Sequence, residues 1–107
     1  MPQFDVHATT GRNSQGTPYI VVIQSSRFGQ RPNRVVIPLV VLDARRGLDE
    51  ELAPHFRIEG HRVYLNPLGI LTVPRSALGR HVMSLADDAA SSAIINAIHA
   101  VITRAYG

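Results

Sequence analysis

The sequence contains no cysteine, no lysine and no tryptophan among its 107 residues. Without cysteine the chain can form no disulfide, no thiol nucleophile and no cysteine-based zinc site. No apolar run approaches the ~20 residues of a membrane-spanning helix. The first residues also lack the basic and apolar regions of a signal peptide. We therefore expect a cytoplasmic protein that does not enter a membrane.

Motifs for catalysis and for cofactor binding are missing as well. The sequence has no GxSxG, P-loop or GxGxxG pattern. Two histidines, His55 and His61, flank a predicted hairpin turn and could oppose one another, but two ligands are too few for a closed zinc site. We interpret them as solvent-facing strand residues. The sequence thus predicts no metal, no cofactor and no catalytic residue, and we expect a protein that is not an enzyme.

The composition indicates one folded domain over residues 1–107, because 45% of the residues are hydrophobic and 18% are charged. The formal net charge is +3, and all 11 basic residues are arginine. These arginines are scattered, with no block of five like charges, so neither a nucleic-acid arm nor direct sequence-specific DNA binding is expected. A mildly basic surface fits an acidic protein partner. A GC-rich genome would also explain the preference for arginine.

Alternating or β-branched segments predict strands over residues 3–8, 19–24, 34–42 and 70–73. The segment 19–24 is almost wholly apolar, which is typical of a strand buried on both faces. Pro38 cannot donate a hydrogen bond, so the strand over 34–42 is expected to end, bulge or lie on an edge there. Residues 55–58 and 61–66 predict a hairpin in which Gly60 supplies the positive φ of the turn.

A C-terminal amphipathic helix is the other predicted element. Ser84 to Asp87 fit a capping box at its start. From there to Ala105, apolar residues recur at spacings of three and four and form one stripe that can pack on the sheet. The fold class is therefore mainly β with a C-terminal α-helix, as a small curved antiparallel sheet or barrel.

Several motifs, in the right order, resemble the CcdB family of bacterial toxins. The resemblance covers about residues 3–102 and rests on the opening Gln3-Phe4-x-Val6, RVVIPL at 34–39, ELAP and HFRIEG within 51–60, Val73-Pro74 with Leu78-Gly79, and Ile95-Asn96-Ala97-Ile98. It implies an SH3-like barrel of the CcdB and MazF type and a homodimer. It also implies a toxin of a type II toxin–antitoxin module that serves plasmid maintenance. Such a toxin binds the DNA gyrase A subunit, inhibits that topoisomerase and is neutralised by an acidic antitoxin.

The C-terminus departs from the family, whose members end in Phe-Trp-Gly-Ile and stack the tryptophan against gyrase. The Trp-Gly-Ile positions become Thr103, Arg104 and Ala105 here. Tyr106-Gly107 lies three residues further on, which on a helix is a rotation of about 300° and a rise of ~4.5 Å. Tyr106 can thus partly replace the missing aromatic. The expected gyrase-binding residues are Thr103, Arg104, Ala105, Tyr106 and Gly107.

Charge alone suggests which residues meet the acidic antitoxin, namely Arg12, Arg45 and Arg46. Two other readings stay open. MazF-type toxins share the barrel and cleave RNA with an arginine and a hydroxyl or histidine, a role open to Arg34 or to His61 with Arg62. His61 and Arg62 point to opposite sides of a strand, however, and do not line one cleft. The altered C-terminus also fits a non-toxic CcdB homologue with a different partner.

Overall fold

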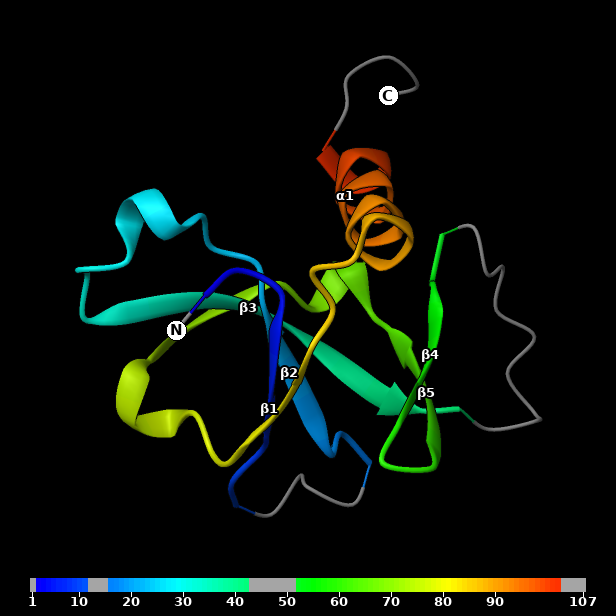
Figure 1. The fold of residues 1–107 in the computed structure, drawn as a ribbon, viewed down its shortest axis with the longest axis horizontal. Helices are drawn as coiled ribbons and strands as arrows, with labels where there is room; N and C mark the ends of the chain where they lie inside the picture. Colours follow the sequence, from blue (N-terminus) through cyan, green and yellow to red (C-terminus); the bar gives the residue numbers. More distant parts are fainter. Residues whose placement is uncertain (1, 12–15, 43–51, 103–107) are drawn as a thin grey trace.

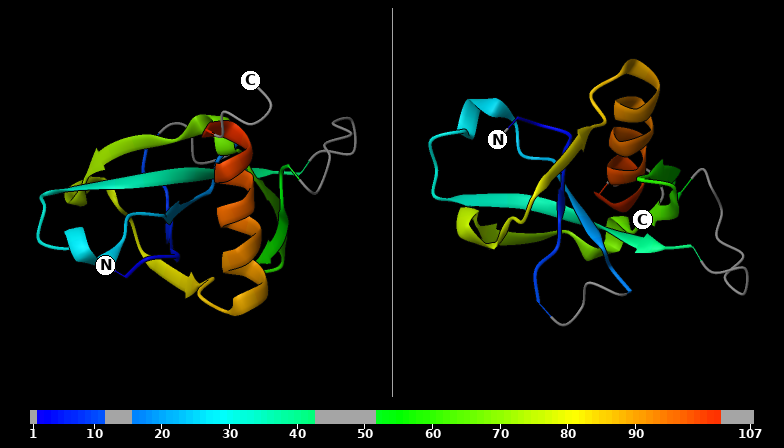
Figure 2. Two further views of the ribbon diagram at one scale, coloured as in Figure 1. Left: turned by 90° about the horizontal axis from the view of Figure 1, so that it is seen from above. Right: turned by 60° about the horizontal axis from the view of Figure 1, so that its bottom comes forward.

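The computed structural model describes residues 2–11, 16–42 and 52–102 (Figure 1). A curved sheet packs against one helix, α1 (Asp88–Ile102), which crosses a single face of the sheet (Figure 2). The predicted fold class, mainly β with a C-terminal helix, is confirmed. The strands are β1 (Asp5–Ala8), β2 (Tyr19–Val22), β3 (Asn33–Val41), β4 (His55–Ile58), β5 (His61–Leu65), β6 (Leu71–Pro74) and β7 (His81–Ser84). The described residues also form the short 3-10 turns η2 (Ser26–Phe28), η3 (Pro67–Gly69) and η4 (Arg75–Ala77).

The strands pair antiparallel in the order β4-β5-β3-β2-β1-β7, and β6 also pairs with β3. The first half of β3 pairs with β6 and its last three residues pair with β5. Pro38 lies between these two stretches, opposite Ile20 of β2. The sequence predicted that the strand would end, bulge or lie on an edge at Pro38, but the strand continues through this residue and pairs with β2 there. It can continue because Pro38 lies between the stretches paired with β6 and β5, where neither of these strands requires an N–H from it.

Strand β2 separates two apolar clusters, as its continuous apolar sequence predicted. Tyr19 and Val21 belong to the main core, which lies between the sheet and α1. Ile20 and Val22 face the other side and pack with Val36 in a smaller cluster. All four residues of β2 are buried, because successive side chains of a strand point to opposite faces and both faces are covered.

The hairpin of β4 and β5 has the predicted turn. Glu59 and Gly60 have φ values of 51° and 81°, so both central residues are left-handed, as a type I′ turn requires. His55 pairs with Tyr64 and His61 pairs with Ile58, so the two histidines do not oppose one another.

The start of α1 lies further along the chain than the predicted capping box. Ser84 belongs to β7, and Asp87 caps the helix, since its Oδ2 accepts a hydrogen bond of 3.1 Å from the Ala90 amide. Strand β7 was not among the strands predicted from the sequence. Their pairing with β1 places the start of the helix against the core, because the Leu85 amide donates to the Phe4 carbonyl.

Candidate functional site

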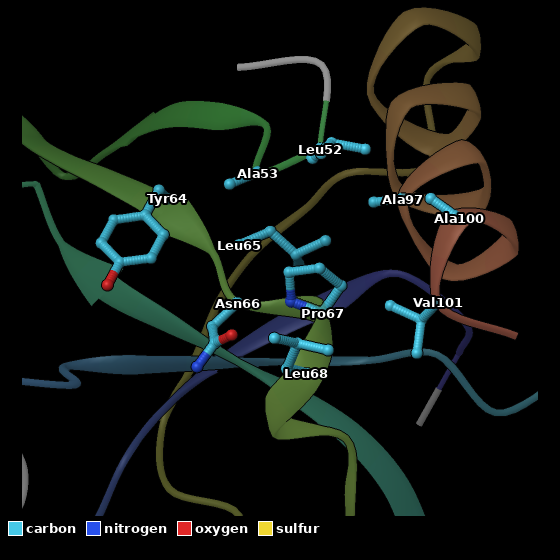
Figure 3. A pocket seen from close by; sticks show the side chains of 10 residues that line it. All are labelled: Leu52, Ala53, Tyr64, Leu65, Asn66, Pro67, Leu68, Ala97, Ala100 and Val101. Atoms are coloured by element: carbon cyan, nitrogen blue, oxygen red, sulfur yellow. The ribbon is translucent and has the colours of Figure 1, made fainter. Parts of the chain in front are cut away.

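An apolar groove lies between the last turns of α1 and the turn η3 (Figure 3). Its volume is about 440 Å³. It is lined by Leu52, Ala53, Tyr64, Leu65, Asn66, Pro67, Leu68, Ala97, Ala100 and Val101. The groove is open to solvent and mostly aliphatic, which is typical of a surface that binds another protein.

The turn η3 presents one of its apolar side chains to solvent. Pro67 begins the turn and is buried, and the Asn66 amide is held by the Pro38 carbonyl at 3.1 Å. Leu68 follows and points outward with 82% of its surface exposed. Exposing a leucine side chain to water is unfavourable in free energy, and a partner that buries Leu68 would remove this penalty.

The apolar stripe of α1 is wider than the core requires. Ile94 and Ala97 are fully buried, as an amphipathic helix predicts. Ile95, Val101 and Ile102 are exposed, with Ile102 at 65%. The prediction of one stripe packing on the sheet is therefore only half right, because the end of the helix keeps apolar residues that the sheet does not cover.

A second cluster joins β1 and β7. Asp5 Oδ2 lies 3.2 Å from His81 Nε2, and the carboxylate is almost buried while the imidazole is about half exposed. His7 is buried, with Nδ1 3.1 Å from the Gly79 carbonyl and Nε2 unpartnered. The rings of His7 and His81 meet edge to face at 5.4 Å. An imidazole held by a carboxylate is a geometry that general acid–base catalysis uses.

A third cluster fixes the tip of the hairpin. Arg80 binds Glu59 through both terminal nitrogens at 3.1 and 3.0 Å, and the Tyr19 hydroxyl donates to Glu59 Oε1 at 2.8 Å. The hydrogen bonds from Arg80, and then that from Tyr19, lower the pKa of the Glu59 carboxyl. Burial, together with the bond to Glu59, raises the pKa of the Tyr19 phenol. This cluster stabilises the fold rather than forming an open site.

None of the sequence-predicted binding residues falls in the part of the chain that the structure describes. The expected gyrase-binding residues Thr103, Arg104, Ala105, Tyr106 and Gly107 lie beyond Ile102, and the expected antitoxin-binding residues are Arg12, Arg45 and Arg46. All eight lie outside the described residues. Their roles therefore stay predictions.

The residues named for an RNA-cleaving site are described. Arg34 is 1% exposed, and its guanidinium donates to backbone carbonyls, so it cannot reach a bound RNA. His61 and Arg62 are both exposed on β5 but pair with different residues of β4, Ile58 and Arg57. Asp5, His7 and His81 were not predicted as a group, because only the pairing of β1 with β7 brings them together. Asp5 and His7 alternating on the first strand were the one local signal.

Within residues 2–11, 16–42 and 52–102, no group of three or more His, Cys, Asp or Glu side chains could hold a metal ion. No helix in the same ranges is both long and apolar enough to cross a membrane.

Two solved mycobacterial structures have a similar fold. One is described as an endoribonuclease in complex with its cognate antitoxin from a mycobacterial species, with a TM-score of 0.73 and 14% identity over 94% of this chain and 92% of its own. The other, the Mycobacterium tuberculosis toxin MazF-mt6, has a TM-score of 0.71 and 15% identity over 90% and 93% of the two chains. At such identities the likeness establishes the fold alone.

The fold and the family together define a toxin of the toxin–antitoxin class. The chain belongs to the CcdB family, because the family model described as CcdB protein matches residues 3–103. The resemblance noted in the sequence is thereby confirmed. No curated protein sequence matches the chain.

One prediction from the sequence is corrected by these comparisons. The absence of catalytic motifs led us to expect a protein that is not an enzyme. The structural relative described as an endoribonuclease contradicts this expectation. The physical reason is that motif spacing detects only sites formed by residues close in sequence, whereas this sheet brings together side chains that are far apart in the chain, as the contact of Asp5 with His81 shows.

Proposed function

We propose that this toxin binds the DNA gyrase A subunit and inhibits the topoisomerase, and that an acidic antitoxin neutralises it. Membership of the CcdB family supports this target. The observation on which the proposal depends is the exposed apolar end of α1, where Ile102 is 65% exposed and is not part of the groove lining. The expected gyrase-binding residues follow this surface directly in the sequence.

The apolar groove is proposed to bind a second copy of the chain, so that the toxin is a homodimer. Leu52, Leu68 and Val101 are exposed in the single chain and line the groove. Two copies related by a two-fold axis would cover the same patch on each subunit. Dimer formation also places two copies of the C-terminal residues on one particle. Leu68→Asp should convert the dimer to a monomer in sedimentation, whereas Leu71→Asp, outside the groove lining, serves as the control.

A supercoiling and cleavage assay with purified gyrase tests the target. We expect the wild-type protein to inhibit supercoiling or to trap cleaved DNA. Tyr106→Ala should lose most of this effect, because interface aromatics commonly contribute ~2 kcal/mol or more. Tyr106→Phe keeps the ring and is the matched control. Full inhibition by Tyr106→Ala would exclude this residue as the anchor, and no effect of the wild-type protein on gyrase would exclude the target.

The antitoxin is proposed to bind through Arg12, Arg45 and Arg46. Arginine forms paired charge-assisted hydrogen bonds with carboxylates, which suits an acidic partner. Arg45→Ala with Arg46→Ala should weaken binding of the cognate antitoxin and make it less salt-dependent. Arg57→Ala with Arg62→Ala removes the same charge from the exposed face of the hairpin and is the control. Equal losses in both double variants would contradict a defined arginine site.

RNA cleavage is the second candidate function, and the Asp5–His81 pair favours it. His81 could take the proton of a ribose 2′-hydroxyl while Asp5 stabilises the resulting imidazolium. The 2′ oxygen then bonds to the adjacent phosphorus, the bond to the 5′ oxygen breaks, and that oxygen takes a proton from water. Purified protein should degrade RNA, His81→Ala should not, and His61→Ala serves as the control. Equal activity of His81→Ala and wild type would exclude this site.

A further inference from the structure

Residues 25–33, which run from the loop after β2 to the first residue of β3, are held in shape from within by a buried arginine. Arg34 donates from Nη2 to the Gly29 carbonyl at 2.7 Å and from Nη1 to the Asn33 carbonyl at 2.9 Å, and also to the Arg31 carbonyl. Gln24 Nε2 donates to the Phe28 carbonyl at 2.9 Å. The loop therefore turns its carbonyl oxygens inward, and its long side chains are left to face outward.

The outer surface of this loop combines an aromatic ring with arginines. Phe28 is 57% exposed, and Arg27 and Arg31 are exposed on either side of it in the sequence. Arg75, also exposed, lies alongside, since its amide donates to the Pro32 carbonyl at 3.0 Å. We call this the arginine loop surface: Arg27, Phe28, Arg31 and Arg75. Figure 1 shows the loop (cyan) on the side of the sheet away from the β4–β5 hairpin.

The positive charge of this surface is not balanced locally. No aspartate or glutamate occurs between residues 16 and 42, or between residues 60 and 86, the two segments that build the surface. Within the described residues, Glu59 contacts Arg80 and Asp5 contacts His81, so Arg34 has no carboxylate partner there. Its buried charge adds to the potential outside the loop, because buried charges are poorly screened. An anionic partner would supply the missing charge.

We propose that the arginine loop surface binds single-stranded nucleic acid, with Phe28 stacking on a base and the flanking arginines contacting phosphates. An exposed ring between arginines is the combination that sequence-tolerant single-strand binding uses. An acidic peptide fits less well, because peptides usually add to a strand edge or fill an apolar groove. Here both sides of β3 next to the loop are already paired, with β2 and with β6, and the loop carbonyls are occupied. The proposal holds whether the toxin acts on gyrase or on RNA.

Fluorescence anisotropy with a labelled 15-nucleotide oligo-dT tests the proposal on the whole protein. Oligo-dT has no 2′-hydroxyl, so RNA cleavage cannot confuse the result. We expect wild-type binding that weakens with salt. Arg27→Ala with Arg31→Ala should bind at least ~10-fold more weakly and lower the slope of log affinity against log salt by about 1.4, which is ~0.7 for each lost phosphate contact. Phe28→Ala should bind about 5- to 10-fold more weakly with an unchanged slope.

Matched variants separate this surface from general basic charge. Phe28→Leu keeps apolar bulk without a stacking ring and should behave like Phe28→Ala, whereas Phe28→Trp should bind at least as well as wild type. Arg57→Ala with Arg62→Ala removes two exposed arginines from the hairpin and should change affinity less than ~2-fold.

Three results would overturn the proposal. One is no anisotropy change with oligo-dT at low salt. Another is an equal loss in the loop and hairpin double variants. The third is Phe28-dependent binding of a labelled oligoglutamate peptide in place of oligo-dT, which would assign the surface to an acidic protein segment.

Discussion

Two arginines hold two parts of this molecule in opposite ways. At the tip of the β4–β5 hairpin, Arg80 is exposed and its charge is matched by Glu59 through two hydrogen bonds. Beneath residues 25–33, Arg34 is buried and meets only carbonyl oxygens in the described chain. The charge of Arg80 is therefore matched within its pair, whereas no carboxylate lies beside Arg34 in the described chain. Of these two arginines, only Arg34 adds an unmatched positive charge to its surroundings.

Removing the buried Arg34 should lower the free energy of unfolding more than any other substitution considered below. Arg34→Met leaves three carbonyl oxygens without their donor, and we expect a loss of about 2–4 kcal/mol in the free energy of unfolding. Urea unfolding followed by circular dichroism measures it. Arg34→Lys keeps the charge but not the planar guanidinium, so its free energy of unfolding should lie between those of wild type and Arg34→Met. A change below ~0.5 kcal/mol for Arg34→Met would mean that the loop does not depend on this side chain.

Removing the Tyr19 hydroxyl, which bonds to Glu59 of the hairpin turn, should lower the free energy of unfolding by a smaller amount. Tyr19→Phe deletes the hydrogen bond to Glu59 and keeps the ring in the core, so we expect a loss of about 1 kcal/mol. The same substitution in a Glu59→Gln background should cost less, because the charged acceptor is already gone. Equal costs in the two backgrounds would show that the tyrosine hydroxyl and the carboxylate are not coupled.

The charge match at the hairpin should appear in the pH dependence of stability. The pKa of Glu59 is lowered in the folded state, so its contribution is fully present above its usual value of 4.5. It is lost as the pH falls through the lowered folded-state pKa. Thermal unfolding of wild type and Glu59→Gln should therefore differ most at neutral pH and converge in acid. A difference that stays constant between pH 3 and pH 7 would contradict this role.

The outward arginines of the loop should matter least to folding. Arg27→Ala with Arg31→Ala should change the free energy of unfolding by no more than ~0.5 kcal/mol, because both side chains are exposed. Urea unfolding of this double variant, beside Arg57→Ala with Arg62→Ala, checks the expectation. A large loss would place these arginines in the structure of the loop and not on its binding surface.

The elements that local pattern determines could be predicted from the sequence. Strand β2 follows from its continuous β-branched residues, and the β4–β5 turn follows from Gly60. The continuation of β3 through Pro38 could not be predicted, because it depends on where along β3 the pairing with β6 stops and the pairing with β5 starts. The same limit hid β7, which is a strand only because β1 lies beside it.

The candidate sites were harder to predict, since each joins residues far apart in the chain. The scattered arginines gave no local signal, yet pairing between β3 and β6 brings Arg75 to the loop that contains Arg27 and Arg31. The burial of Arg34 was also unexpected, because a charged residue at a strand start normally faces water. The family and its fold were accessible because several short motifs occur in a fixed order.

Strand β3 has a consequence for how the chain folds. It pairs with β2, β5 and β6, whereas β7 pairs with β1, about 75 residues earlier in the sequence. Contacts over such separations form slowly, since a long loop must close before any pairing is gained. We expect β2 and β3 to associate early as a nucleus. The joining of β7 to β1, with α1 docking after it, would then complete the sheet as a late step that sets the refolding rate.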